Sequence, residues 1–129
     1  MSLISLKRSS RHKVNMDLTW EMSTLVGYVG DTWITFCTNL GEFTITSAKD
    51  GKHRKGSFHD SGNAVDVRTR HLFRKGRYKK SFLIFISSLQ KEFGPHGLRI
   101  FLHGYHDKGV PHLHIAYDKK KGSLWSWVK

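Results

Sequence analysis

The chain is poor in cysteine and has no long hydrophobic run. Its single cysteine, Cys37, excludes an internal disulfide framework and a zinc site built from several thiolates, so we expect a soluble protein of a reducing compartment. No apolar segment approaches the ~20 residues of a membrane span. Residues 1–13 place a short apolar patch before basic residues, the reverse of a secretory signal, which predicts synthesis in the cytoplasm without a signal peptide.

Acidic residues are also scarce. Ten Asp and Glu stand against 22 Lys and Arg, which gives a formal net charge of +12. Such an excess favours polyanions, among them nucleic acid, anionic lipid and acidic cell-wall polymers. The three densest basic segments are not interleaved with aromatic residues as in a platform for base stacking. They are Lys7–Lys13, Arg68–Lys80 and Lys119–Lys121. Charge alone therefore identifies no partner.

A length of 129 residues fits one domain, and 38% hydrophobic with 25% charged residues is an ordinary globular balance. We expect residues 1–129 to form this single domain, with 1–15 as a loose basic arm. Apolar residues spaced three and four apart predict a helix from about Met22 to Leu40, ended by Gly41. A serine cap followed by dense apolar residues predicts a second helix, Ser81–Phe93.

Alternating apolar and polar residues predict the strands of the domain. The strands Leu98–His103 and Pro111–Asp118 are predicted to form a β-hairpin. The segment Arg70–Lys80 is interpreted as a basic connector. The predicted fold class is α+β, with two helices packed on a small, mostly antiparallel sheet. The predicted strands are Glu42–Ser47, Ala64–Arg68, Leu98–His103 and Pro111–Asp118. Trp125 and Trp127 in the tail either close the core or lie exposed.

Two short stretches concentrate residues that can carry chemistry. The first runs from Ser57 to Asp66 and the second is His112–His114. A catalytic zinc site takes three protein ligands from histidine and carboxylate side chains and leaves a fourth position to water. Both residue types occur in these stretches, so the sequence predicts a metal site built from them.

The spacing within each stretch favours convergence on one point. Gly62 allows the chain to fold back, so that His59 and Asp66 can face the same point. His112 and His114 are two residues apart on a predicted strand, so both project from one face. If this strand lies beside Ala64–Arg68, all four side chains meet. Three of them would bind the metal, and the fourth would be free to move protons.

The combined motif, S-x-H-x-x-G-x-A-x-D followed by H-x-H, resembles that of a family of zinc peptidases. This family includes D-alanyl-D-alanine carboxypeptidases, phage endolysin peptidases and the hedgehog signalling domain. The resemblance covers about Thr24 to Asp118 and is strongest with the small phage and bacterial members. It implies the α+β fold of these peptidases. The matching residues are Ser57, His59, Gly62, Ala64, Asp66, His112 and His114.

The resemblance implies a role for each matching residue. It makes His59, Asp66 and His114 the ligands of Zn²⁺, and His112 the general base or acid. Many relatives carry an acidic residue shortly before the last histidine, and Val110–Pro111 supplies none, so His112 takes that place here. A neutral imidazole with an ordinary pKa of about 6.5 is suited to accept and return a proton.

Further polar residues complete the implied site. Ser57 would hydrogen-bond to the metal-binding side chains, and His53 or Arg54 would hold substrate or stabilise negative charge. The spacing leaves open which of the two does so. The implied activity is hydrolysis of peptidoglycan stem or cross-link peptides by a monomer, as a carboxypeptidase or an endopeptidase. It would reach the wall after release from the host cell or by delivery with the virion.

Two alternatives stay open. The segment Pro111–Ile115 and the positive charge also resemble rolling-circle nucleases of the HUH type, which bind a divalent metal and attack single-stranded DNA with a tyrosine on a later helix. Nothing after His114 predicts such a helix, and the stretch Ser57–Asp66 would have no role. The third interpretation is a zinc-stabilised binding module without catalysis.

Overall fold

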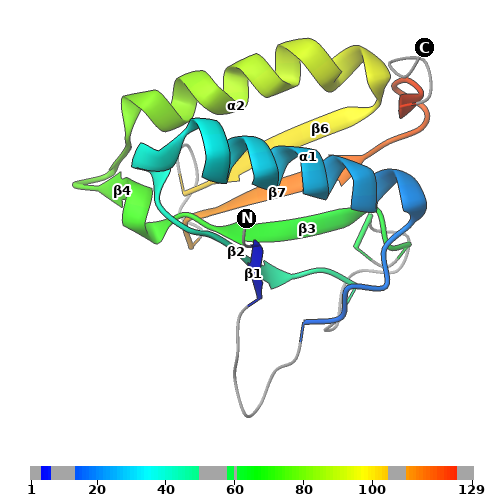
Figure 1. The fold of residues 1–129 in the computed structure, drawn as a ribbon, viewed down its shortest axis with the longest axis horizontal. Coiled ribbons are helices and arrows are strands. Elements are labelled where there is room, and N and C mark those ends of the chain that lie inside the picture. Colours follow the sequence, from blue (N-terminus) through cyan, green and yellow to red (C-terminus); the bar gives the residue numbers. More distant parts are fainter. Residues whose placement is uncertain (1–3, 7–13, 50–57, 60, 105–109, 125–129) are drawn as a thin grey trace.

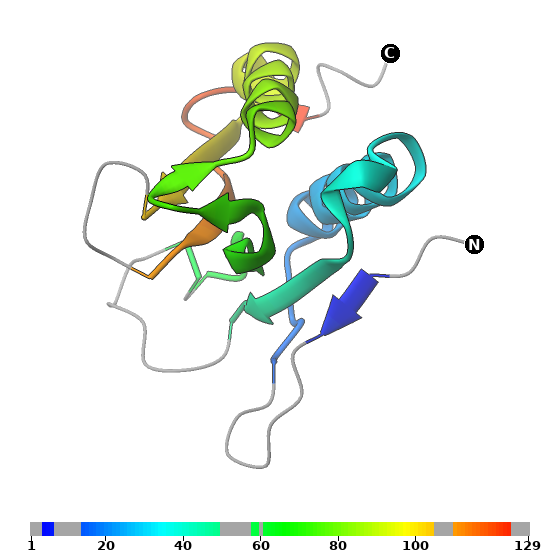
Figure 2. The ribbon, with the colours of Figure 1, turned by 90° about the vertical axis from the view of Figure 1, so that its left-hand side faces the viewer.

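The computed structural model describes residues 4–6, 14–49, 58–59, 61–104 and 110–124. These residues form a five-stranded sheet with two helices on one of its faces, together with a separate two-stranded hairpin (Figures 1 and 2). The predicted α+β class, with two helices on a mostly antiparallel sheet, is confirmed. No helix of the described residues is long and apolar enough to cross a membrane.

The order of strands across the sheet is β1-β2-β3-β7-β6, in which only the β1–β2 pair is parallel. The four strands predicted from alternation correspond to β2, β3, β6 and β7. The elements are β1 (Ile4–Leu6), α1 (Trp20–Phe36), η1 (Thr38–Leu40), β2 (Phe43–Ser47), β3 (Ala64–Arg68), η2 (Arg70–Leu72), β4 (Phe73–Arg74), β5 (Arg77–Tyr78), α2 (Lys80–Phe93), η3 (Gly94–His96), β6 (Leu98–His103) and β7 (His112–Tyr117).

Helix α1 packs the face that its apolar spacing predicts. Its buried residues, Met22, Leu25, Val26, Val29 and Trp33, recur every three or four positions. The helix begins earlier than predicted, because the side chain of Thr19 accepts a hydrogen bond from the backbone N–H of Met22 and caps the first turn. It also ends earlier, at Phe36, and Leu40 reaches the core from a separate 3-10 turn.

Helix α2 lies where the sequence predicts it, but its cap differs. The residue that precedes the helix is Lys79, which makes no side-chain cap hydrogen bond. Ser81 lies inside the first turn, and its Oγ accepts a hydrogen bond from the side-chain amide of Asn39 at 3.2 Å. The predicted serine cap is therefore wrong. Burial of Phe82, Phe85 and neighbouring apolar side chains against the sheet and α1 stabilises this helix instead.

The sheet has one buried and one open face, as the period-two pattern predicts. Val65 and Val67 of β3 and Leu113 and Ile115 of β7 are fully buried beneath the helices. The residues that alternate with them point to the opposite face, which neither helix covers (Figure 2). Polar side chains of β3, β7 and β6 therefore share one surface.

Two segments are more ordered than the sequence indicates. Ile4–Leu6 lie in the predicted loose arm, yet they form β1 and pair with β2. The side chain of Ile4 packs against Gly30 of α1, where even a methyl group would meet it at 2.8 Å. The predicted connector Arg70–Lys80 contains η2 and the β4–β5 hairpin, whose turn places Lys75 and Gly76 at φ 52° and 76°.

Gly62 lies in the turn that joins His59 to β3. Its φ is +78°, and a Cβ there would meet the carbonyl oxygen of Asp17 at 2.8 Å. Gly62→Ala is expected to lower the free energy of unfolding by about 1–3 kcal/mol, measured by denaturant unfolding. Gly27→Ala is the matched control, because Gly27 lies on the exposed side of α1 with no atom within 4 Å of its added Cβ.

Gly27→Ala should raise the free energy of unfolding by about 0.4–1 kcal/mol, because alanine lowers the conformational entropy of the unfolded chain. Equal effects of the two substitutions, or an unchanged stability of Gly62→Ala, would contradict the conclusion that the turn requires glycine at position 62.

Candidate metal centre

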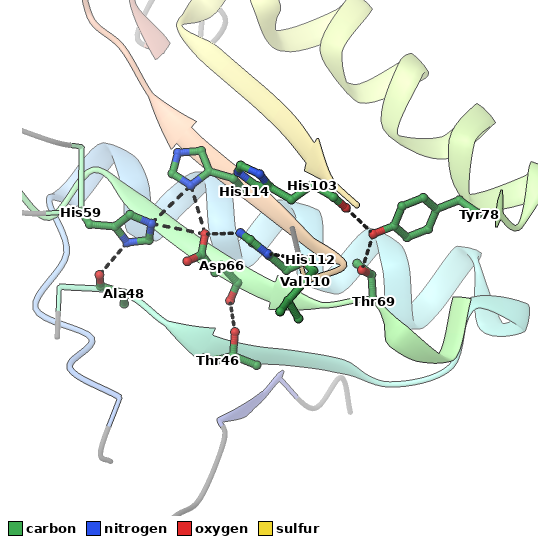
Figure 3. Close-up of polar contacts among 10 residues, drawn as sticks. All are labelled: Thr46, Ala48, His59, Asp66, Thr69, Tyr78, His103, Val110, His112 and His114. Carbon is green, nitrogen blue, oxygen red and sulfur yellow. Dashed lines mark hydrogen bonds and ion pairs between the residues drawn. The ribbon is translucent and has the colours of Figure 1, made fainter. Parts of the chain in front are cut away.

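Three side chains meet at the open face of the sheet (Figure 3). Asp66 on β3 and His114 on β7 are direct register partners, so both project from the same face at the same level. His59 comes from the turn before β3, which is closed by hydrogen bonds from Gly62 N to His59 O at 3.1 Å and from Asn63 N to Phe58 O at 2.7 Å. Strands β3 and β7 are neighbours in the sheet, which is the condition that convergence of these side chains requires.

The distances between the ligand atoms fit a small tetrahedral ion. Asp66 Oδ1 lies 3.2 Å from His59 Nε2 and 3.0 Å from His114 Nδ1, and the two nitrogens are 3.3 Å apart. A tetrahedron with metal–ligand distances of about 2.0–2.1 Å has edges of about 3.3–3.4 Å. One ion can therefore contact all three atoms with little movement of the side chains.

The surroundings of His59 also suit a metal ligand. Its Nδ1 lies 2.7 Å from the carbonyl oxygen of Ala48, which can only accept, so Nδ1 carries a hydrogen. In the neutral ring Nε2 then has a lone pair, and it faces the carboxylate of Asp66. Two electron-rich atoms at this separation need a proton or a cation between them. A backbone carbonyl that holds the far nitrogen of a histidine is a usual feature of metal sites.

Asp66 supplies the negative charge of the cluster. Partial burial opposes ionisation of its carboxyl group. When the histidines carry the proton that lies between these atoms in the absence of a cation, hydrogen bonds from His114 and His59 and the charges of their rings outweigh this effect, so the pKa of Asp66 lies well below its usual value. The hydroxyl of Thr46 on β2 donates to the Asp66 backbone carbonyl at 3.3 Å. An ionised carboxylate with two imidazoles is a donor set that zinc accepts.

The cluster is closed on one side and open on the other. The exposed fraction of the side chain rises from 7% in His59 to 18% in Asp66 and 23% in His114. This gradient leaves the outer side accessible to water or a substrate. Three protein ligands and one open position are the arrangement of catalytic rather than structural zinc sites.

His112 lies beside the cluster but is not part of it. It points from the same face of β7 as His114, and its Nε2 is 3.9 Å from Asp66 Oδ1. Its Nδ1 is 2.8 Å from the carbonyl oxygen of Val110, so Nδ1 donates and the neutral ring directs a proton-accepting Nε2 toward the cluster. His112 therefore lies next to the group of three convergent ligand atoms without belonging to it.

His103 is a neighbour that the sequence did not single out. It is the register partner of His112 on β6, and the two rings stack with centroids 4.2 Å apart and planes at 18°. Its backbone carbonyl accepts a hydrogen bond from the hydroxyl of Tyr78 at 2.7 Å. Only the register of the hairpin places it here.

Cavities flank the cluster on two sides. One of about 820 Å³ lies over β6 and β7 and is lined by His114 together with Phe58, Arg99, Phe101, His103 and neighbouring residues. Another of about 400 Å³ is lined by Asp66 and His112 together with Thr46, Arg68, Arg70, Val110 and Pro111. A chain molecule lying across the sheet can therefore extend from the cluster in both directions.

Three expected site residues fall outside the described part of the chain. They are His53, Arg54 and Ser57. Their roles, a cationic contact to substrate and a hydrogen bond to the metal-binding side chains, stay predictions.

No family model, curated protein or solved structure matches this chain. The chemical interpretation therefore depends on the residues of the site and their geometry.

Proposed function

We propose that this protein is a zinc-dependent peptidase that hydrolyses peptide bonds in peptidoglycan stem or cross-link peptides. The observation that supports this most strongly is the convergence of His59 Nε2, Asp66 Oδ1 and His114 Nδ1 at mutual distances of 3.0–3.3 Å. A proton acceptor, His112 Nε2, lies next to them on the open side. The peptidoglycan substrate follows from the resemblance of the motif to wall peptidases.

Each residue has a defined task in this proposal. His59, Asp66 and His114 would hold the ion, which would supply a Lewis acid and increase the acidity of a nearby water. His112 Nε2 removes a proton from the attacking water and returns it to the leaving amine. The hydrogen bond from His112 Nδ1 to the Val110 carbonyl keeps the ring in the tautomer that can do so. No covalent intermediate with the protein is required.

The flanking cavities suit a peptide that carries both apolar and anionic groups. The larger cavity combines the rings of Phe58 and Phe101 with the guanidinium of Arg99. The smaller one presents Arg68 and Arg70 beside the cluster. Stem peptides contain carboxylate groups, which arginine binds in a bidentate manner.

The experiment is digestion of purified peptidoglycan, followed by detection of new amino groups and mass spectrometry of the fragments. We expect release of amino groups that stops with a chelator and returns with Zn²⁺. The fragment masses identify whether terminal or internal bonds are cut. A zinc-loaded protein that releases no amino group from peptidoglycan would contradict the proposal and favour a binding module.

The nuclease alternative finds little support in the described residues. Tyr117 follows the histidines on the same strand, but it points to the helix-covered face and is only 5% exposed. A residue so placed cannot attack DNA at the open face. Nicking of single-stranded DNA with a covalent tyrosine adduct would nevertheless overturn the peptidase proposal.

A further inference from the structure

A basic hollow is lined by residues of η2 and of the β4–β5 hairpin. Figure 1 shows β4 projecting at one end of the domain. The segment Arg68–Lys80, which forms the hollow, contains seven Lys and Arg residues and no Asp or Glu. The hollow measures about 490 Å³. Its lining residues are His71, Leu72, Arg74, Arg77, Tyr78 and Lys79. This surface therefore concentrates positive charge around a concave site outside the metal centre.

The hairpin places two like charges opposite each other. Arg74 on β4 and Arg77 on β5 are register partners, and like charges in directly opposed positions destabilise a two-stranded ribbon. The ion pairs among the described residues involve neither guanidinium. A destabilising pair at the rim of a hollow is what an external anion would relieve.

The walls of the hollow are held in place by specific contacts. The hydroxyl of Tyr78 donates to the His103 carbonyl at 2.7 Å and contacts Thr69 Oγ1 at 2.9 Å, which fastens the hairpin to the end of β6 (Figure 3). Lys79 Nζ donates to the Asn39 carbonyl at 3.0 Å. The cationic groups are thus carried on a preorganised frame, which lowers the entropic cost of binding.

We propose that this hollow, which Arg74 and Arg77 line, is a binding site for the phosphate groups of a polyol phosphate chain, an anionic polymer of cell walls. Phosphodiester groups match arginine through bidentate hydrogen bonds. Tyr78, the only Phe, Tyr or Trp among the residues that line the hollow, is 5% exposed and offers no face for stacking of bases. A phosphate chain without bases therefore fits better than nucleic acid.

The site is connected to the metal centre along the chain. Arg68 and Arg70 line the cavity beside Asp66 and His112, and the residue after Arg70 is His71, which lines the hollow. A bound polymer would hold the open face of the sheet near the wall to which the polymer is attached. The choice of a wall polymer rests on the proposed function, whereas binding of a phosphate chain by these arginines does not.

The test measures binding of the full chain to a fluorescently labelled poly(glycerol phosphate) and to a single-stranded oligonucleotide with the same number of phosphates. Fluorescence anisotropy is recorded over a range of salt concentrations. Arg74→Gln/Arg77→Gln is expected to weaken binding of the glycerol polymer at least about tenfold. It should also reduce the slope of the logarithm of the binding constant against the logarithm of salt concentration by about 1.4. Each of the two lost arginine–phosphate contacts accounts for about 0.7 of this change.

A charge-matched control is Lys119→Gln/Lys120→Gln, two exposed residues beyond the opposite end of β7. It should change the affinity less than about threefold. The arginine variant should unfold at an unchanged or higher temperature, because a like-charge pair is removed. Asp66→Asn should leave polymer binding unchanged, so failure of the metal site and failure of this site are distinguishable.

Two results would overturn the proposal. Equal losses in the arginine and lysine variants would mean that only net charge matters. Tighter binding of the oligonucleotide than of the glycerol polymer, with the same dependence on Arg74 and Arg77, would assign the site to nucleic acid.

Discussion

Replacing His112 by glutamine is expected to lower the rate of peptidoglycan hydrolysis by about 10²–10⁴-fold while the protein keeps its zinc. Glutamine has a similar length, but it cannot accept a proton as the Nε2 of His112 does, and general base catalysis contributes about this factor. His112 Nε2 is 3.9 Å from Asp66 Oδ1, outside the convergent set of ligand atoms, so zinc affinity should change little. The rate of amino-group release and the zinc content of the same samples are measured.

His96→Gln is the matched control for this substitution. His96 lies in η3, in a different part of the fold, so the same chemical change there should leave the rate unchanged. Full activity of His112→Gln would refute the assigned proton transfer. Loss of zinc together with activity would instead make His112 a metal ligand.

Asp66→Asn is expected to weaken zinc binding at least about 100-fold, more than the 10–100-fold loss typical of an outer hydrogen-bonding partner. In the wild-type chain, zinc at 100 times its dissociation constant should raise the free energy of unfolding by about 2.7 kcal/mol. This corresponds to an increase of about 10 °C in the midpoint temperature of unfolding. At the same zinc concentration a 100-fold weaker site gains only about 0.4 kcal/mol. Thermal unfolding with and without zinc measures this difference within each variant.

Asp17→Asn provides the control, because Asp17 is an exposed carboxylate whose partner is Lys49 at 3.3 Å on the surface. Its zinc-dependent stabilisation should equal that of the wild type. An undiminished zinc effect in Asp66→Asn would show that the metal binds elsewhere.

Much of the metal centre follows from strand periodicity. The alternation of Val65 and Val67 with Asp66 predicted that the carboxylate leaves the core face, and the same rule placed His114 on one face of its strand. Periodicity alone does not say which strands are neighbours. The pairing of Asp66 with His114 could be expected only through the resemblance of the motif, and the register confirms it.

The features that the sequence did not predict depend on long-range contacts. β1 has three residues and no measurable period, and it is stabilised by pairing with β2 and by packing of Ile4 on Gly30. His103 enters the site because β6 and β7 pair in a particular register, which the residue pattern does not specify. The β4–β5 hairpin was not predicted, because its many basic residues made the segment resemble a connector. Lys75-Gly76 between Phe73 and Tyr78 is nevertheless a turn signal.

X-ray absorption spectroscopy at the zinc edge, on the full chain loaded with one equivalent of Zn²⁺, measures the ion's ligands most directly. The expected result is one zinc per chain with two imidazole nitrogens at about 2.0–2.1 Å and one carboxylate oxygen at about 2.0–2.2 Å, completed by water. His59→Ala and His114→Ala should each remove one nitrogen from this set. A chain that retains no zinc, or a spectrum that neither substitution alters, would contradict a metal centre at His59, Asp66 and His114.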